Sequence, residues 1–385
     1  MLVKSNKMTI TFVTNFFHHH QWPVADYLYD MIGDDYHYIA TAPVSDMLVK
    51  GGYDPNQDRP YLVRAYSDDE TLVKSRKLID ESDVVIIGAA PIEWVLKRQN
   101  ENKVTFHYSE RWLKNNVWKY YMPSSLFNIW RHYGRFRKKR VYLLCASAFA
   151  ASDVRRFGCF PNKCFKWGYF STVDQVGDDF KNKSKSNTTN IMWCARFLDW
   201  KHPELVVHLA RKLKDKSYNV HINMFGTGTE YDKIRSLCTL LDVDDMITFQ
   251  GNVSNDEILH RMRQHDVFIF TSDRNEGWGV VLNEAMSNGC AAIASHEIGS
   301  VPYLIKDGVN GLIFQSKNLD SLVQKVTYLL DNSELVNRYG NAAIQTMRTE
   351  WSPKVAAERF LKLATYAYSN RLGEYDDIDG PASWA

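Results

Sequence analysis

Short apolar runs alternate with longer, mostly amphipathic stretches along the whole chain. Because the runs are apolar throughout, they are typical of parallel strands that a sheet buries on both faces. The stretches between them, such as Pro203–Lys214 and Glu230–Leu241, are long enough for helices. The pattern therefore predicts two series of βαβ units. The expected strands are Thr9–Thr14, Tyr36–Thr41, Tyr61–Arg64, Val84–Ile87, Val104–Tyr108 and Val141–Cys145, then Asn190–Cys194, Val220–Phe225, Ile247–Phe249, Val267–Phe270, Ala291–Ala294 and Gly311–Phe314.

One long polar segment separates the two series. Residues 172–190 have no apolar periodicity, which is typical of a linker. We therefore predict an α/β protein with two doubly wound, Rossmann-like domains facing a cleft, over residues 1–172 and 190–352, with a linker at 173–189. Ligands of such sheets bind beyond the carboxyl ends of the strands, so the strand-end loops are where chemistry is expected.

Composition limits the class of protein. With 45% apolar and 24% charged residues, the 385-residue chain has the balance of a soluble globular protein. Its apolar runs are too short to span a bilayer, and the N-terminal run is too short for a secretion signal. The six cysteines form no C-x-x-C or zinc spacing. We expect a cytoplasmic protein without a metal site.

Charge is unevenly distributed. Residues 1–172 hold 24 Lys and Arg against 17 Asp and Glu, a net charge of +7, whereas the remainder holds 23 against 28, a net charge of −5. Residues 111–140 alone contain nine Lys and Arg, no acidic residue and eight aromatic residues. Within them Leu126, Ile129, Trp130 and Tyr133 lie on one helical stripe. This pattern is typical of a helix beside an anionic membrane, and it equally suits an anionic polymer or a stripe that faces the protein's own core.

The most informative motif follows the strand Val267–Phe270. It is Thr271-Ser-Asp-Arg-Asn-Glu-Gly-Trp-Gly279, with a helix predicted from about Gly279 to Gly289. Glycines beside a helix start let a phosphate approach free backbone N–H groups. Glu276 in the loop and Glu284 in the helix are acceptors for hydroxyl groups. The motif suits a ligand with both phosphates and hydroxyls; the alternative is a pair of solvated surface carboxylates.

Two further motifs follow strands of the second half. Arg196 and Lys201 come after Asn190–Cys194, where two cations would neutralise a diphosphate, unless they are ordinary surface charges. Phe225-Gly-Thr-Gly228 fails as a dinucleotide fingerprint because the third glycine is missing and Gln250 stands where an acidic residue would bind the ribose. A tight strand–helix turn is the better interpretation of this second motif.

Taken together, these motifs resemble the nucleotide-sugar half of family 4 glycosyltransferases. The resemblance is carried by Cys194-Ala-Arg-Phe-Leu, Lys201, Phe225-Gly-Thr-Gly228, Phe249-Gln-Gly251, Glu276-Gly-Trp-Gly279 with Glu284, and Asp307-Gly-Val-Asn-Gly-Leu312. It covers residues 190–350. The first half resembles, less specifically, the acceptor half of bacterial members that build surface polysaccharides, through Asn15, His19-His-Gln21, Tyr108-Ser-Glu-Arg111 and Trp167-Gly-Tyr169.

The resemblance implies a GT-B fold and a role for each motif. Arg196 and Lys201 would hold the donor diphosphate, Glu276 the sugar hydroxyls, and Glu284 the ribose. The helix from about residue 353 to 385 would pack back on the first domain. The other residues implied in donor binding are Gly277, Trp278, Gly279, Val280 and Val281 for sugar and phosphate, Gly251 and Val253 for the base, Gly226, and Asn15, His19, His20 and Gln21 from the first domain.

The chain departs from the family pattern in two places. Gly88-Ala-Ala follows Val84–Ile87 where many relatives have a histidine or an acid, so His107 on the next strand is expected to contact substrate instead. The loop after the first strand lacks a glycine pair, and side chains of His19, His20 and Gln21 would substitute for backbone N–H groups.

The resemblance also implies the reaction. It predicts a retaining, hexosyltransferase-like enzyme that needs no metal or cofactor and transfers a sugar from a nucleoside-diphosphate donor, by default a UDP-sugar, to a glycan or lipid-linked acceptor. It predicts no nucleic-acid partner, and the basic block allows a peripheral position on the inner membrane face. Two other classes fit parts of the sequence. They are an NAD-dependent oxidoreductase and a non-catalytic, basic module that binds membrane or polymer.

Overall fold

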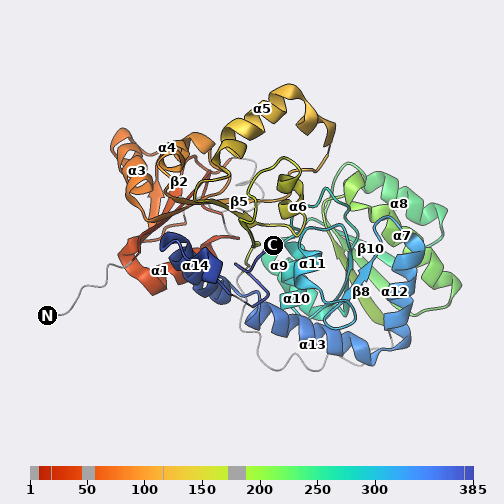
Figure 1. The fold of residues 1–385 in the computed structure, drawn as a ribbon. Helices are drawn as coiled ribbons and strands as arrows, with labels where there is room; N and C mark the ends of the chain where they lie inside the picture. The colour runs from red at the N-terminus through yellow and green to blue at the C-terminus, as the bar shows by residue number, and fades with distance from the viewer. Residues whose placement is uncertain (1–7, 19, 46–56, 116, 172–187, 377) are drawn as a thin grey trace. The chain divides into compact units, whose positions relative to one another are not determined.

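A computed structural model describes residues 8–18, 20–45, 57–115, 117–171, 188–376 and 378–385. The chain divides into two compact units (Figure 1). Unit 1 comprises residues 1–172 and 352–385, and unit 2 comprises residues 173–351. Most of the predicted linker at 173–189 lies outside the described residues, and so does His19.

Unit 1 contains a parallel seven-stranded sheet in the order β3-β2-β1-β4-β5-β6-β7. Its central strands β1 and β4 are buried along their whole length, as expected for apolar runs covered on both faces. Every strand predicted in this half is present, and the short edge strand β7 was not predicted. The strands are β1 (Ile10–Thr14), β2 (Tyr36–Ala40), β3 (Leu62–Arg64), β4 (Val84–Ile87), β5 (Val104–Ser109), β6 (Val141–Cys145) and β7 (Cys164–Lys166).

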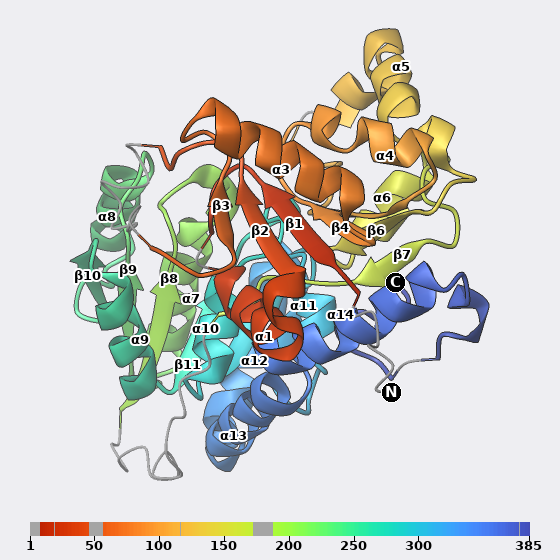
Figure 2. The same cartoon turned by 90° about the vertical axis from the view of Figure 1, so that its left-hand side faces the viewer.

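Helices cover both faces of this sheet. Figure 2 shows α3 and α4 on one face and α1 with α14 on the other. The last helix, α14, is capped by Ser352 and buries Phe360 beside Phe106 of β5, with ring centroids 5.4 Å apart. Residues from the end of the chain therefore complete the core of unit 1. The helices are α1 (Trp22–Ile32), α3 (Asp69–Glu81), α4 (Leu96–Asn100), α5 (Pro123–His132), α6 (Ala150–Arg155) and α14 (Pro353–Tyr368).

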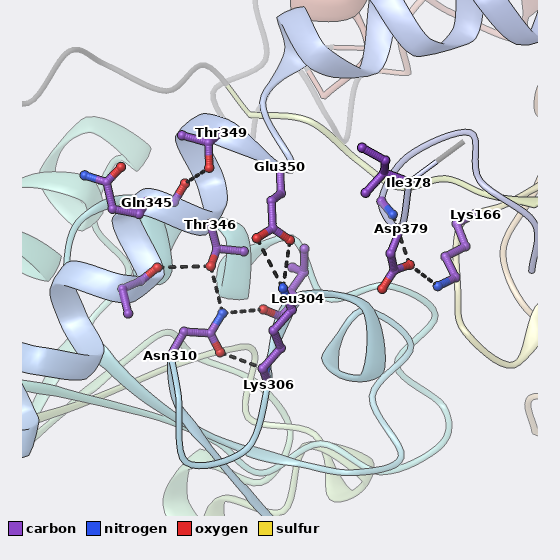
Figure 3. A network of polar contacts seen from close by, with 12 residues as sticks. Lys166, Leu304, Lys306, Asn310, Gln345, Thr346, Thr349, Glu350, Ile378 and Asp379 are labelled. Atoms are coloured by element: carbon purple, nitrogen blue, oxygen red, sulfur yellow. Dashed lines mark hydrogen bonds and ion pairs between the residues drawn. The ribbon is translucent and has the colours of Figure 1, made fainter. Parts of the chain in front are cut away.

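The C-terminal tail pairs with the edge of the same sheet. Trp384 forms an antiparallel bridge with Phe165 of β7, and their rings lie 4.5 Å apart. The ammonium group of Lys166 pairs with the carboxylate of Asp379, as Figure 3 shows. The tail thus covers backbone groups that an edge strand would otherwise expose.

Unit 2 contains a parallel six-stranded sheet in the order β10-β9-β8-β11-β12-β13. This is the doubly wound order, in which the direction of winding reverses between β8 and β11. All six predicted strands are present, so the predicted fold class is confirmed. The strands are β8 (Thr189–Cys194), β9 (Val220–Phe225), β10 (Ile247–Gly251), β11 (Val267–Phe270), β12 (Ala291–Ser295) and β13 (Leu312–Phe314).

The helices of unit 2 form two groups. Helix α7 contacts α8 and α12, and α10 contacts α9 and α13. The first group packs against the sheet through a large apolar cluster that includes Leu209, Ile222 and Leu322. The helices are α7 (Pro203–Asp215), α8 (Tyr231–Leu240), α9 (Asn255–Gln264), α10 (Val281–Ser287), α11 (Val301–Leu304), α12 (Leu319–Asp331) and α13 (Glu334–Thr349).

The Asp307–Leu312 motif has a structural role. The buried Asn310 amide donates to Leu304 O and to Thr346 Oγ1, each at 2.9 Å, and its oxygen accepts from the Lys306 N–H at 2.7 Å (Figure 3). Lys306 and Glu350 form an ion pair at 3.1 Å beside it. The motif therefore fastens the loop before β13 to α13.

Candidate functional site

The predicted donor residues of unit 2 follow β8 and β11, the two strands at which the winding reverses. Doubly wound sheets bind their ligands at this position, because the loops that follow the two strands diverge there. Arg196 and Lys201 follow β8, and the loop from Thr271 to Gly279 follows β11. The sequence order alone therefore brings the cations and the glutamates to one edge of one sheet.

Lys201 and Glu276 form an ion pair at this edge. The Lys201 ammonium contacts Glu276 Oε2, and the two side chains are only 11% and 12% exposed. Ser272 Oγ also donates to Glu276 Oε2, at 3.1 Å. The Lys201 ammonium lies over the ring of Trp200, 4.3 Å from its centroid. Both charged groups are therefore held in place before any ligand binds.

A buried hydrogen-bond chain fixes the backbone of Lys201. The indole of Trp193 in β8 donates to Thr271 Oγ1 at 2.9 Å, and that hydroxyl donates to Lys201 O at 2.5 Å. The chain joins β8, the end of β11 and the loop that carries Lys201. It explains why Thr271 and Trp193 are fully buried although both carry polar atoms.

A second polar cluster joins the same two loops. Asp273 accepts from His202 Nε2 at 3.3 Å and from the Lys317 ammonium at 2.9 Å, and Glu204 contacts His202 Nδ1 at 2.8 Å. Burial alone would lower the pKa of His202, but the hydrogen bonds to Asp273 and Glu204 outweigh it and raise the pKa to about 9. Burial would raise the pKa of Asp273, and its bonds to His202 and Lys317 instead hold that pKa well below its usual range.

The sequence interpretation missed this His202 cluster. His202, Asp273 and Lys317 are separated by 71 and 44 residues. Asp273 lies in the Thr271–Gly279 motif, but no motif connects it with His202 or Lys317. The available signal was the position of His202 directly after Lys201, at the start of a helix with Pro203 at its first turn.

Gly279 can only be a glycine. Its φ is 85°, and a Cβ there would lie 2.6 Å from the ring of Phe270. The helix that follows is α10, which has seven residues, with Val280 at its N-cap and Val281 as its first residue. The structure thus places Gly277, Gly279, Val280 and Val281 in a tight turn beside Glu276.

The side chain of Trp278 does not face this turn's surface. It is fully buried, and its indole donates to Asn283 Oδ1 at 2.9 Å and packs against Tyr303 and Trp351. The expectation for Trp278 concerned its backbone N–H group, and that expectation stays a prediction.

Glu284 is a buried carboxyl on α10. It is 8% exposed, and its side chain has no hydrogen bond among the residues that the structure describes. Burial raises the pKa of Glu284 to about 7. The nearby Cys194 thiol has its pKa raised to about 12 by burial and by the Glu284 charge, while Lys201 acts in the opposite direction. Glu284 and Lys201 therefore lie close enough to Cys194 for both charges to be felt there.

Arg196 is the exposed cation of the cluster. Its guanidinium has no ion-pair partner within the described part of the chain. An exposed arginine on the loop that also carries Lys201 is suited to binding an incoming anion.

The remaining predicted residues of unit 2 lie on two neighbouring turns. A Cβ on Gly226 would lie 2.1 Å from Ala195 O, and one on Gly228 would lie 2.3 Å from Phe197 O. These glycines therefore let the turn after β9 pack against the Arg196 loop, as a tight strand–helix turn. Gly251 has φ 69° with open space around its Cα, and Val253 is exposed.

In unit 1 the predicted residues lie after β1. The Asn15 side chain accepts from the Phe16 N–H at 2.9 Å and so shapes its own loop. Gln21 accepts from the hydroxyl of Tyr38 at 2.7 Å, and the ring of His20 lies 5.8 Å from that of Tyr169.

His107 does not lie on a strand-end loop. It is buried inside unit 1, where Gln99 Nε2 donates to its Nε2 at 2.6 Å and the rings of Tyr133 and Phe160 pack edge-on against it. Burial lowers the pKa of His107 to about 3, so it is neutral at physiological pH. These contacts make it a residue of the core, and we no longer count it among the substrate contacts.

Among the described residues, no three His, Cys, Asp or Glu side chains are grouped so that they would hold a metal ion. No helix within those ranges has the length and apolar character required to cross a membrane.

Comparison with known families identifies the domain that carries this site. Residues 175–346 match the family model described as glycosyl transferases group 1. The matched range covers most of unit 2 and all of its strands. An uncharacterized glycosyltransferase of Methanocaldococcus jannaschii is 24% identical over 196 residues, which are 50% of this chain and 49% of that protein. A D-inositol 3-phosphate glycosyltransferase of Streptomyces bingchenggensis is 26% identical over 176 residues, 43% of this chain and 38% of that protein. The chain thus spans about half or less of these relatives.

Solved structures resemble the whole chain. Anabaena HepE in complex with UDP and glucose has a TM-score of 0.65 at 12% identity, covering 93% of this chain and 100% of that one. A glycosyltransferase from Rickettsia africae has a TM-score of 0.66 at 18% identity, covering 95% and 100%. The two units together therefore have the fold of these solved structures, the two-domain GT-B fold.

Proposed function

We propose that the protein is a retaining glycosyltransferase, which transfers a sugar from a nucleoside-diphosphate donor to a glycan or lipid-linked acceptor in polysaccharide or glycoconjugate synthesis. The observation that carries this proposal is the Lys201–Glu276 ion pair at the reversal point of a group 1 domain, with Arg196 and Glu284 beside it. The bound UDP and glucose of the structurally similar Anabaena protein support UDP as the nucleotide.

Each residue of the cluster has a proposed role that its environment supports. Lys201 and Arg196 bind the diphosphate. The Lys201 ammonium has three N–H donors, so it can contact phosphate without releasing Glu276. Glu276 accepts from hydroxyl groups of the sugar. Glu284, which lacks a hydrogen-bond partner among the described residues, accepts from the ribose hydroxyls.

The proposed reaction exchanges one C–O bond for another on the same face of the sugar. The bond between the anomeric carbon and the phosphate oxygen breaks, and negative charge develops on the departing diphosphate. The acceptor hydroxyl bonds to the anomeric carbon from the same side and passes its proton to that phosphate. Arg196 and Lys201 stabilise the departing charge, a contribution of about 3 kcal/mol for each well-placed donor.

We further propose that no resident metal or organic cofactor takes part. In this proposal Arg196 and Lys201 bind the diphosphate, so the charge that a metal would neutralise has partners in the protein. Activity that persists in excess EDTA is the expected result, and activity that is lost in EDTA and restored by a divalent cation would contradict this part of the proposal.

Arg196→Ala is the cleanest test of the site, because the exposed guanidinium has no ion pair whose loss would unfold the domain. We expect about 100-fold lower kcat/KM for release of UDP from the preferred UDP-sugar. Arg338→Ala, an exposed arginine on α13, is the matched control and should retain full activity. Equal activity in both variants would remove Arg196 from the site. The anomeric coupling constant of the product, measured by NMR, tests retention.

A further inference from the structure

The helix α5 presents an apolar surface that none of the described residues of unit 1 covers. None of its residues is buried. Trp118 is 81% exposed, Phe127 57% and Trp130 56%. Exposed apolar side chains that gather in one place mark interaction sites more often than scattered ones do. The α5 surface comprises the apolar residues Trp118, Tyr121, Met122, Leu126, Phe127 and Trp130 and the cationic residues Lys119, Arg131, Arg135, Arg137 and Lys138.

The structure divides the predicted apolar stripe into two parts. Ile129 and Tyr133 pack against the apolar cluster around Phe136 and Val141, so they attach α5 to unit 1. Leu126 and Trp130 point away from that cluster and are exposed. In both Figure 1 and Figure 2, α5 lies outside the sheet of unit 1, beyond α4 and α6. One side of the helix therefore packs against unit 1, and the other side is exposed to solvent. We call the second side the free side.

Exposed aromatic rings lie in pairs on the free side of α5 and on the segment that precedes it. The ring centroids of Phe127 and Trp130 lie 6.0 Å apart, and those of Trp118 and Tyr121 lie 6.4 Å apart. The segment that carries Trp118 and Tyr121, Val117–Tyr121, contacts α5 directly. Two pairs of exposed aromatic side chains thus lie on two consecutive elements that contact each other.

The cations of the α5 surface have no acidic partners. Residues 111–140 contain no Asp or Glu. Arg131, Arg135, Arg137 and Lys138 are exposed and form no ion pair within the described residues. Charge of one sign without counter-charges excludes a second copy of this surface as the partner, because the two would repel, and it favours an anionic partner.

We propose that the α5 surface docks the protein on an anionic lipid bilayer. A soluble polyanion would use the cations but leave Leu126, Met122 and the aromatic rings in water. At a bilayer the apolar side chains enter the interface, Trp and Tyr lie at headgroup level, and Arg and Lys reach the lipid phosphates. Only a bilayer surface uses both halves of the α5 surface. This inference goes beyond the proposed function and does not depend on it.

Sedimentation of the full chain with lipid vesicles tests the proposal. We expect binding to vesicles of phosphatidylcholine with phosphatidylglycerol, weak binding to phosphatidylcholine alone, and weaker binding at high salt. Phe127→Ser with Trp130→Ser should reduce the partition coefficient about tenfold or more. Arg135→Gln with Lys138→Gln should reduce it about 25-fold, at about fivefold per cation.

A matched control distinguishes binding through the α5 surface from non-specific binding through other exposed apolar side chains. Val73→Ser with Leu240→Ser removes two apolar side chains that are 69% and 79% exposed elsewhere, and should bind vesicles as the wild type does. All variants should unfold at the wild-type temperature, because the substituted side chains are exposed. UDP binding should also be unchanged, so failure of this proposal is distinguishable from failure of the transferase proposal.

Three outcomes would overturn the proposal. The first is no binding to phosphatidylglycerol vesicles. The second is equal binding by the wild type and the Phe127→Ser, Trp130→Ser variant. The third is tight binding of soluble polyphosphate without vesicle binding, which would make the α5 surface a polymer site.

Discussion

At the scale of single residues, burial of the Glu284 carboxyl lowers the stability of the fold, a cost that its proposed role in donor binding would explain. Its carboxyl is buried without a hydrogen bond among the described residues, and burial raises its pKa to about 7. Between the unfolded pKa of about 4.5 and the folded pKa of about 7, the folded state binds more protons than the unfolded state. Stability therefore falls as pH rises through this range.

Glu284→Gln removes the cost of ionising a buried carboxyl. We predict that its free energy of unfolding in urea exceeds that of the wild type by up to about 3 kcal/mol near pH 8 and differs little near pH 4. The variant should nonetheless bind UDP more weakly. Glu334→Gln, which changes an exposed carboxylate, should have neither effect. A Glu284→Gln protein no more stable than the wild type at pH 8 would contradict this explanation.

For the Lys201–Glu276 pair we predict the opposite effect, because replacing one member should lower the free energy of unfolding. Removing one partner leaves a buried charge alone, which costs about 3 kcal/mol, whereas removing both does not. Lys201→Met and Glu276→Leu should each destabilise the protein, and the double variant should recover most of the loss. Urea denaturation of the three variants measures the coupling, and simple additivity would show that the two groups do not interact.

The sequence predicted some of these residues and missed others for a physical reason. Arg196, Lys201, Glu276 and Glu284 could be proposed from the sequence because each follows or lies near a strand end, which is readable from the apolar pattern. Their roles stay predictions. His107 was placed wrongly because its burial depends on Tyr133 and Phe160, which are distant in sequence. His202 and Asp273 were missed because only the fold brings them together.

At the scale of elements, the His202 cluster fastens the loop after β8 to the loop after β11. The pKa of His202 is raised from 6.5 to about 9, so its stabilising contribution is complete below about pH 6.5 and is lost as pH rises through about 9. We predict that His202→Gln lowers the free energy of unfolding by up to about 3 kcal/mol near pH 6 and by little near pH 10. A pH-independent difference in urea denaturation would show that hydrogen bonding of the charged ring is not the cause.

In unit 1, Arg98 joins three elements through backbone carbonyls. Its fully buried guanidinium donates to Ile79 O, Ser82 O, Val104 O and Asp83 O. Arg98→Met would leave these acceptors unsatisfied and should cost about 3 kcal/mol, visible as a lower melting temperature. Arg98→Lys should restore only part of the loss, because an ammonium group cannot reach all four. An unchanged melting temperature in Arg98→Met would show that the carbonyls have other partners.

Helices and strands could be predicted from the sequence where the apolar pattern was long enough to be recognised. The twelve predicted strands are present, and the central ones, such as β1, β4, β6, β11 and β12, are runs that both faces of a sheet bury. Strand β7 was missed: its sequence, Cys-Phe-Lys, contains no β-branched residue and no apolar run. For α5 the pattern gave the helix but not its free side, because a stripe that faces a core and one that faces a partner look alike in sequence.

At the scale of the whole molecule, the order of strands determines where the chemistry lies. The reversal of winding between β8 and β11 places cations and carboxylates at one sheet edge, and the group 1 family match covers that unit. Repetition of βαβ units made the fold class predictable, whereas the identity of the donor depends on side-chain positions that the pattern does not contain.

The most direct test of the account is thermal unfolding of the protein with UDP, GDP, ADP, CMP and NAD at matched concentrations. We predict stabilisation by a nucleoside diphosphate, UDP by default, of about 2.7 kcal/mol at 100 times its dissociation constant. The effect should be reduced in Arg196→Ala and retained in Arg338→Ala. Stabilisation by NAD alone, or by none of the five ligands, would contradict the proposed donor site.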